Sequence, residues 1–317
     1  MDDNTENSSL TINEVLDNLK SSDSLSIPML YLLSDLAPSE ISEFCGAWSS
    51  IDPERRQVIV RHLADISEEN FEVDFTDVFA HCLDDDSPEV RKASLDGLWD
   101  SERVALIGPI IDLMEGDPDA GVRVLAAATL GHYVLLGEWR QIPERSVDPI
   151  VESLLNQIES THTKELVRYA ALESVAASGN PRVESLIHEA YDSADLTAQK
   201  SALFAMGRSA DTRWINTVID EMSSPMVELR VEAARAAGEI GHRSAIPELI
   251  ELTSDEDLEV RLVAISALGR IGGDIPRQYL QEIIEDFDDE DLSEAASIAL
   301  DEMDWIGGES DLSLGDL

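Results

Sequence analysis

Apolar and small residues recur along most of this chain at the spacing of amphipathic helices. The segment from Pro225 to Gly241 shows this clearly, because its apolar positions follow helical periodicity and its last residue is a glycine, which commonly ends a helix. After a short turn, residues 245–252 repeat the amphipathic pattern, with Pro247 in the first turn, where its missing amide hydrogen costs nothing. The pattern predicts a unit made of a first helix and a second helix.

An arginine marks one position of each first helix and defines a repeat. The marked positions follow one another at steps of 32, 45, 31, 31 and 31 residues, and in three units a glycine lies eight residues after the arginine. A weaker copy begins at Arg56, and a last copy, at Ser293, lacks the arginine. The sequence therefore predicts about eight helix pairs, and the marked positions are Arg91, Arg123, Arg168, Gln199, Arg230 and Arg261.

This repeat, with its D-x-x-V-R-x-x-A-x-x-A-L-G pattern, resembles the HEAT-repeat superfamily, and in particular the short HEAT-like repeats of the phycobilisome lyases. The resemblance covers roughly residues 52 to 303. It implies an all-α fold, a right-handed α-solenoid of the armadillo and HEAT type, in which each helix pair buries its apolar face against its neighbours. It implies little about function, because the superfamily includes scaffolds, transport adaptors, lyases and chaperones.

Four regions follow from the extent of the repeat. Residues 1–11 form an acidic, serine-rich start that we expect to be disordered, and residues 12–51 contain helical runs without the repeat, which predict an N-terminal helical cap. The HEAT-like array occupies residues 52–303, and residues 304–317 form an acidic C-terminal tail. The helical runs of the cap are Ile12–Lys20, Ile27–Leu36 and Ser39–Trp48.

The charge of the chain excludes some classes of partner. There are 66 Asp and Glu against 22 Lys and Arg, so the formal net charge is -44. Nucleic acid and anionic membranes are bound through clustered Lys and Arg, so we expect neither as a partner. The acidity has three explanations that stay open: a basic protein partner, adaptation to high salt or solubility, and an inhibitor that mimics DNA. The oligomeric state also stays open.

Cysteine usage points to a cytoplasmic protein. Cys45 and Cys82 lack the spacing of a zinc or redox site and are too few for a disulfide framework, which favours a reducing compartment. The start of the chain has no basic and apolar segments of a signal peptide, and no later stretch has the 18 or so uncharged apolar residues of a membrane span. We therefore expect a soluble protein of the cytoplasm.

No pattern in the chain indicates catalysis. The six histidines are scattered, and His188-Glu189 is the one His-Glu pair, whereas a deoxyhypusine hydroxylase needs several to hold its iron. The acidic runs at 84–86 and 285–291 lack the order of a calcium-binding loop. We predict no cofactor, no metal and no enzyme activity, and hence a protein-interaction scaffold. The alternatives are a phycobilin-lyase-like or chaperone-like HEAT protein, besides the DNA mimic.

The periodic arginines are predicted to support the fold rather than to bind a ligand. Their acidic partners are expected in the turns between helices, such as Asp86, Asp119 and Asp257. Removing one partner from a partly buried pair would cost about 3–5 kcal/mol. This structural ladder consists of Arg91, Arg123, Arg168, Arg230 and Arg261.

The resemblance to HEAT arrays implies that second helices line the concave face. The carboxylates of these helices would then give that face a negative potential, suited to a basic segment of a protein partner. Apolar anchors are expected at Trp139, within an insertion at 133–148, and at Trp214, with Arg208 beside it. The predicted carboxylate contacts are Asp112, Glu152, Glu184, Asp220, Glu248, Glu251 and Glu282.

Overall fold

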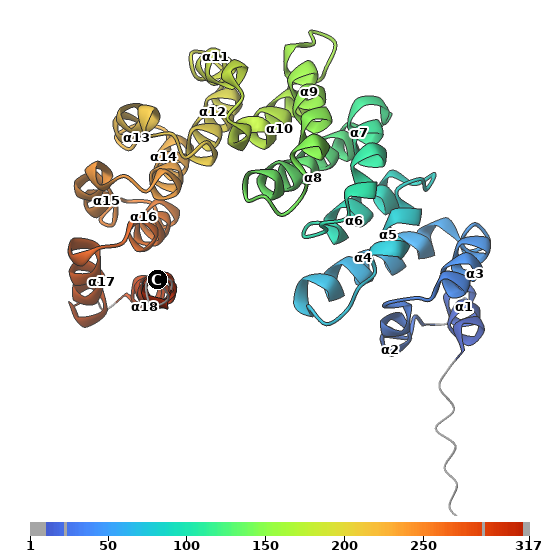
Figure 1. Ribbon diagram of the computed structural model, residues 1–317. Coiled ribbons are helices and arrows are strands. Elements are labelled where there is room, and N and C mark those ends of the chain that lie inside the picture. The colour runs from blue at the N-terminus through green and yellow to red at the C-terminus, as the bar shows by residue number, and fades with distance from the viewer. Residues whose placement is uncertain (1–10, 22–23, 287–288, 313–317) are drawn as a thin grey trace, which may run out of the picture. The chain divides into compact units, whose positions relative to one another are not determined.

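The computed structural model describes residues 11–21, 24–286 and 289–312, and all regular structure in these ranges is helical (Figure 1). The all-α solenoid fold is therefore confirmed, and its handedness stays a prediction. The expected disorder of residues 1–10 lies outside the described residues. The last helix, α18, spans Glu290–Leu312 and so continues past residue 303 into the segment expected to be a tail.

The N-terminal segment consists of α1 (Ile12–Lys20), α2 (Ile27–Leu30), a 3-10 turn η1 (Tyr31–Leu33) and α3 (Pro38–Trp48). Thr11 caps α1 by accepting a hydrogen bond from the amide of Glu14, whose side chain in turn accepts from the amide of Thr11. The run expected as one helix over 27–36 is split. Asp35 adopts a left-handed conformation with φ of 51°, which ends this helical segment.

Two kinds of helix alternate through the rest of the chain. The helices of the first kind carry the marked arginine position: α4 (Pro53–Glu69), α6 (Pro88–Gly97), α8 (Ala120–Glu138), α10 (Glu165–Val175), α12 (Leu196–Arg208), α14 (Val227–Ile240), α16 (Leu258–Ile271) and α18. The helices of the second kind are α5 (Thr76–Cys82), α7 (Ile107–Gly116), α9 (Glu144–Glu159), α11 (Pro181–Tyr191), α13 (Ile215–Glu221), α15 (Ile246–Leu252) and α17 (Asp274–Asp286). Short 3-10 turns precede some of them: η2 (Val104–Leu106), η3 (Ala176–Ser178), η4 (Thr212–Trp214) and η5 (Arg243–Ala245).

The chain divides into two compact units. The first unit consists of Met1–Gln157 and Thr161–Val167, and the second of Ile158–Ser160 and Arg168–Leu317. In the first unit α4, α6 and α8 pack side by side, while α5 packs on α6 and α7 packs on α8. Each unit therefore has its own core between two layers of helices.

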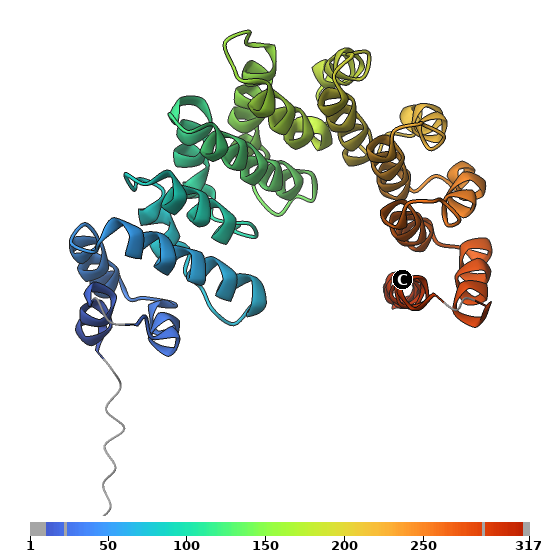
Figure 2. The same ribbon diagram turned by 180° about the vertical axis from the view of Figure 1, so that it is seen from behind.

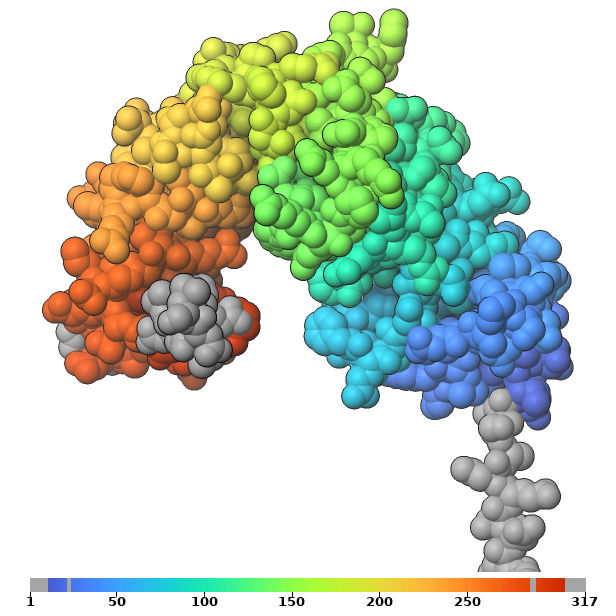
Figure 3. Space-filling view, in the orientation of Figure 1, coloured from blue at the N-terminus to red at the C-terminus, as the bar shows by residue number. Residues whose placement is uncertain are grey.

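The second unit has an inner and an outer layer. Helices α12, α14, α16 and α18 pack on one another in sequence and lie on the inner side of the bend of this unit, so we call them the inner layer (Figures 1 and 2). Helices α11, α13, α15 and α17 form the outer layer and pack against the inner helices. Their ends form successive knobs along the outer edge of the unit (Figure 3). The expectation that second helices line the concave face is therefore wrong for this unit.

Small residues explain why the arginine-bearing helices lie inside. A Cβ atom on Gly207 would lie 2.7 Å from the Cα of Ala236, and one on Gly238 would lie 2.9 Å from the Cα of Ala267. Contacts this close bring successive inner helices together, because interaxial distance depends on the side chains at the contact. The repeated glycine thus serves close helix packing, and the end of α14 falls later, at Gly241, with φ of 68°.

The insertion after α8 lengthens that helix and its successor. Tyr133 is fully buried and its hydroxyl donates a hydrogen bond of 3.2 Å to the carbonyl of Arg103. The connection to α9 packs Ile142 into the core and turns at Arg140, which has φ of 60°. Among the described helices, α8 alone is long and apolar enough to cross a membrane by length and composition, and half of its apolar window is buried within the fold.

Candidate functional site

The arginine ladder has a consistent geometry where its pairs are complete. Arg91 binds Asp117 through two hydrogen bonds of 2.7 Å, from Nε and a terminal nitrogen, and its other terminal nitrogen donates to the carbonyl of Asp85 at 2.7 Å. Arg230 repeats this pattern with Asp255, at 2.8 Å twice, and with the carbonyl of Ser224 at 3.0 Å. Each guanidinium therefore ties its own helix to the turns before and after it.

The carboxylate partners differ from those expected. They are Asp85, Asp117 and Asp255, which lie two residues before each N-terminal cap and also accept a hydrogen bond from the backbone amide of that cap residue. The expected partners Asp119 and Asp257 instead cap their own helices. The reason is geometric: only a residue ahead of the cap faces back towards the preceding helix. Asp86 was also expected as a partner, but the neighbouring Asp85 forms the ion pair instead, with Arg56.

The ladder is incomplete in the middle of the array. Arg123 bonds to the carbonyl of Met114 and the side chain of Gln157, both at 2.8 Å, and Arg168 bonds to the carbonyl of Ile158 at 2.8 Å. Arg261 makes a single, longer contact of 3.3 Å with Asp289. The marked arginines therefore differ widely in how much they support the fold.

The predicted partner carboxylates lie on helices of the second kind. In the second unit this places them in the outer layer, where α11, α13, α15 and α17 together hold ten Asp and Glu against two Lys and Arg. Glu184 is ion-paired with Arg213, and Glu248 is half-buried with one unbonded oxygen, while Asp220 and Glu251 are exposed. Glu282, which accepts from Gln278, is exposed there too, as Asp112 and Glu152 are in the first unit.

The three other candidate residues differ in their exposure to solvent. Trp214 is only 4% exposed and its ring lies 4.6 Å from that of His188, so the expectation of a surface anchor at Trp214 is wrong. It fills the junction between η4 and α13 because its apolar ring is more stable in the core. Trp139 is 62% exposed on the insertion of the first unit. Arg208 is half-buried at the end of α12, in the inner layer.

Three of the four inner-layer helices differ in composition from the outer layer, whereas the fourth, α18, holds eight Asp and Glu and no Lys or Arg. Helices α12, α14 and α16 hold six Lys and Arg against four Asp and Glu, although the chain as a whole has three times as many acidic as basic residues. Two of these cations, Arg230 and Arg261, belong to the ladder. The other four are Lys200, Arg208, Arg235 and Arg270.

Three carboxylates lie among these four cations. Burial raises the pKa of Glu232, Glu239 and the neighbouring Glu173 of α10, against the lowering effect of the nearby cations and, at Glu173, of a hydrogen bond from Ser201. Glu232 is 6% exposed, with one oxygen bound to Arg235 at 2.6 Å and the other unbonded. Desolvated carboxylates of this kind are frequent at functional sites. We call these seven residues the inner cluster.

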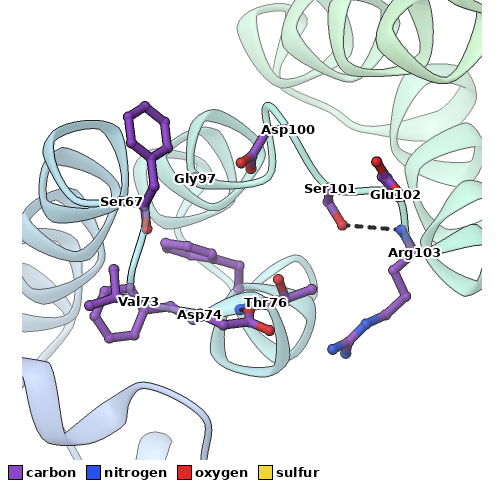
Figure 4. Close-up of a pocket in the computed structure, with 12 residues that line it drawn as sticks. Ser67, Val73, Asp74, Thr76, Gly97, Asp100, Ser101, Glu102 and Arg103 are labelled. Carbon is purple, nitrogen blue, oxygen red and sulfur yellow. Dashed lines mark hydrogen bonds between the residues drawn. The ribbon is translucent and has the colours of Figure 1, made fainter. Parts of the chain in front are cut away.

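A cavity of about 330 Å³ opens in the first unit between the end of α4, the start of α5 and the loop after α6 (Figure 4). Its floor contains the buried rings of Phe75 and Phe79, and Phe71 lies beside it, 78% exposed. The exposed carboxylates at its edge are those of Asp74, Asp100 and Glu102.

Negative charge exceeds positive charge around this cavity. Arg103 lies on its wall but is already ion-paired with Asp77. Burial opposes ionisation of Asp74, but hydrogen bonds from Thr76 and the charge of Arg103 outweigh it and lower the pKa of Asp74. The cavity therefore offers aromatic rings and ionised carboxylates, a combination that suits a cationic side chain.

Within residues 11–21, 24–286 and 289–312, no group of three or more His, Cys, Asp or Glu side chains is arranged to hold a metal ion. The run at 285–291 falls partly outside these ranges.

Comparison with known families agrees with this architecture. A family model for HEAT repeats matches residues 215–301, which begin at α13 and end within α18. Residues 215–301 therefore contain HEAT repeats. The match starts on α13, a helix of the outer layer.

The relatives share the repeats at low sequence identity. A HEAT repeat-containing taxis protein of Halobacterium salinarum is 26% identical over 158 residues, which is 47% of this chain and 39% of that protein. Yeast importin-beta matches with a TM-score of 0.55 and 13% identity, over 92% of this chain and 46% of that one. The phycocyanin lyase complex of CpcE and CpcF from Nostoc sp. PCC7120 matches with a TM-score of 0.49 and 18% identity, over 72% and 93%. The chain thus spans less than half of its taxis relative.

The inner cluster could have been found from the HEAT register. Its residues on α14 and α16 lie two, five and nine positions after the ladder arginine: Glu232, Arg235 and Glu239 after Arg230, and Arg270 after Arg261. These positions share one helical face. The sequence analysis missed these residues because it assigned the concave face to the other helix of each pair.

Proposed function

We propose that this HEAT-repeat protein is a non-catalytic scaffold that binds a basic segment of a partner protein on the outer layer of its second unit. The observation that supports this proposal is the excess of negative charge on the outer layer, with ten acidic and two basic residues on its four helices. A surface of one sign attracts a complementary partner and speeds its association. The basic segment thus binds opposite to where the concave-face hypothesis placed it.

The same proposal locates the protein in the cytoplasm. Cys45 and Cys82 are free thiols, and Cys82 is buried, with its pKa raised by that burial, so it is a poor nucleophile and serves packing. A scaffold role also fits the repeats themselves, because a row of helix pairs offers an extended surface rather than one enclosed site.

The test is a charge reversal on the outer layer. Asp220 and Glu251 suit it because both are exposed, whereas Glu248 is half-buried and its reversal would also disturb packing. We expect Asp220→Lys with Glu251→Lys to slow association of a labelled poly-lysine peptide about tenfold at low salt, with a smaller effect on dissociation. Stopped-flow fluorescence measures both rates.

A matched control separates the site from the net charge. Glu68→Lys with Glu69→Lys makes the same change of charge on exposed residues of α4, in the first unit, and should slow association much less. Equal slowing by both pairs would show that the peptide senses only the overall charge. If both pairs leave binding unchanged while Trp139→Ala abolishes it, the insertion is the binding site instead.

A further inference from the structure

The cations of the inner cluster make few close ion pairs for so acidic a chain, although Glu173, Glu232 and Glu239 lie near them. Lys200 and Arg208 make no ion pair within 4 Å with any residue of the described structure, and Arg270 approaches Glu239 only to 3.8 Å. Elsewhere in the second unit, Arg213 and Arg230 each bind carboxylates within 2.8 Å. In a chain with a threefold excess of acidic residues, cations without close partners need a different explanation from fold support.

Two of these arginines flank a niche on the surface of the inner layer. Arg235 from α14 and Arg270 from α16 line a hollow of about 70 Å³, together with Val263, Ser266 and Ala267. One terminal nitrogen of Arg235 is bound to Glu232. Its remaining donors, and all those of Arg270, make no hydrogen bond within the described structure. The niche is therefore small, partly apolar, and lined by unused guanidinium donors.

We propose that the inner layer binds an acidic segment of a partner protein, with one carboxylate of that segment seated in the niche between Arg235 and Arg270. This site is separate from the proposed docking surface for a basic segment, because it lies on the other layer and has the opposite charge. A guanidinium donates two parallel hydrogen bonds to a carboxylate, and the size of the niche suits a single small group.

The positions of the other cations give the direction of the bound segment. Lys200 and Arg208 lie on α12, Arg235 on α14 and Arg270 on α16, so the cations cross three successive inner helices. Packed helices lie about 8–10 Å apart and an extended chain advances about 3.3 Å per residue. A segment that crosses the inner layer therefore presents a carboxylate to each helix when its acidic residues are about three apart.

Salt distinguishes this site from the outer surface. The net charge of the protein repels an acidic segment over long distances, and salt screens that repulsion, whereas the contacts inside the niche are short and partly buried. Binding of an acidic segment should therefore strengthen as ionic strength rises from about 0.01 M to about 0.15 M. Binding of a basic segment to the outer layer should weaken over the same range.

The experiment uses the full chain and a labelled peptide with glutamate at every third position, in fluorescence anisotropy titrations at the two salt concentrations. The control peptide has glutamine at those positions and should bind at least about tenfold more weakly, because a charge-assisted pair is lost at each. Binding of the two peptides with equal affinity would overturn the proposal, as would glutamate-peptide binding that only weakens with salt.

Variants locate the site. Arg235→Gln with Arg270→Gln should weaken binding of the glutamate peptide about tenfold or more. The control pair Arg145→Gln with Arg243→Gln removes the same charge from exposed arginines outside the inner layer and should have little effect. Ser266→Phe fills the niche, keeps both arginines and should also weaken binding. Each variant is accepted only if its circular dichroism spectrum matches the parent, and unchanged binding in both niche variants would refute the assignment.

Discussion

The contribution of each ladder arginine to the stability of the fold should increase with the burial of its ion pair. Arg91 should contribute most. The side chains of Arg91 and Asp117 are 9% and 3% exposed, and the guanidinium makes three hydrogen bonds of 2.7 Å. In Arg91→Met the aspartate keeps only its bond from the amide of Asp119, so a buried negative charge loses its counter-ion. Such a loss costs about 3–5 kcal/mol.

The assay is thermal unfolding followed by far-ultraviolet circular dichroism. A domain of this size shifts its midpoint by about 2–4 °C for each kcal/mol, so Arg91→Met should melt about 10 °C below the parent. Arg261→Met is the comparison, because its pair is a single contact of 3.3 Å between side chains that are 25% and 35% exposed. We expect it to cost at most about 1 kcal/mol.

A second substitution tests the physical cause. Adding Asp117→Leu to Arg91→Met removes the stranded charge, and the double variant should recover much of the lost stability, since a buried ion pair can be replaced by apolar groups at little cost. The reasoning would be refuted if Arg91→Met melted within about 2 °C of the parent, or if the shifts of Arg91→Met and Arg261→Met were equal.

Two further predictions concern packing and ionisation in the inner layer. Gly207→Ala should destabilise the second unit by about 1–3 kcal/mol in urea unfolding, because the new methyl group would meet the backbone of Ala236, whereas Gly46→Ala, with open space around it, should be neutral or stabilising. Burial raises the pKa of Glu232, so its contribution to stability is full below the unfolded pKa and lost as the pH rises through the folded pKa. Glu232→Gln should therefore melt higher than the parent at about pH 7, with the difference vanishing near pH 4, and an equal difference at both values would contradict this.

Repeat arrays favour prediction of the fold from sequence, because each unit restates the same local pattern. The period of the arginines, the capping residues and the apolar spacing indicate paired helices without any long-range information. The insertion is visible as a step of 45 residues between Arg123 and Arg168, and it lengthens α8 and α9 in the structure.

The partners of the ladder were not determined by the sequence. Asp85 and Asp86 are adjacent and chemically identical, yet only Asp85 is buried and faces Arg56, because the turn directs it back towards the preceding helix. Trp214 is a similar case, since local sequence does not determine whether a tryptophan at the start of a helix faces the core or the solvent. Its contact with His188 of α11 settles the question.

The sequence by itself determined the helical repeat, the periodic arginines and the excess of negative charge. Only the tertiary structure decided which helices form the inner layer and which form the outer layer. The glycines of the arginine-bearing helices permit close contacts such as that of Gly207 with Ala236, so these helices form the inner side of the second unit. The acidic helices α11, α13, α15 and α17 are thereby left on the outside, and the cations Lys200, Arg208, Arg235 and Arg270 of α12, α14 and α16 lie on the inside. A sequence records the charge of each residue, but the side of a solenoid on which it lies depends on how closely neighbouring helices pack.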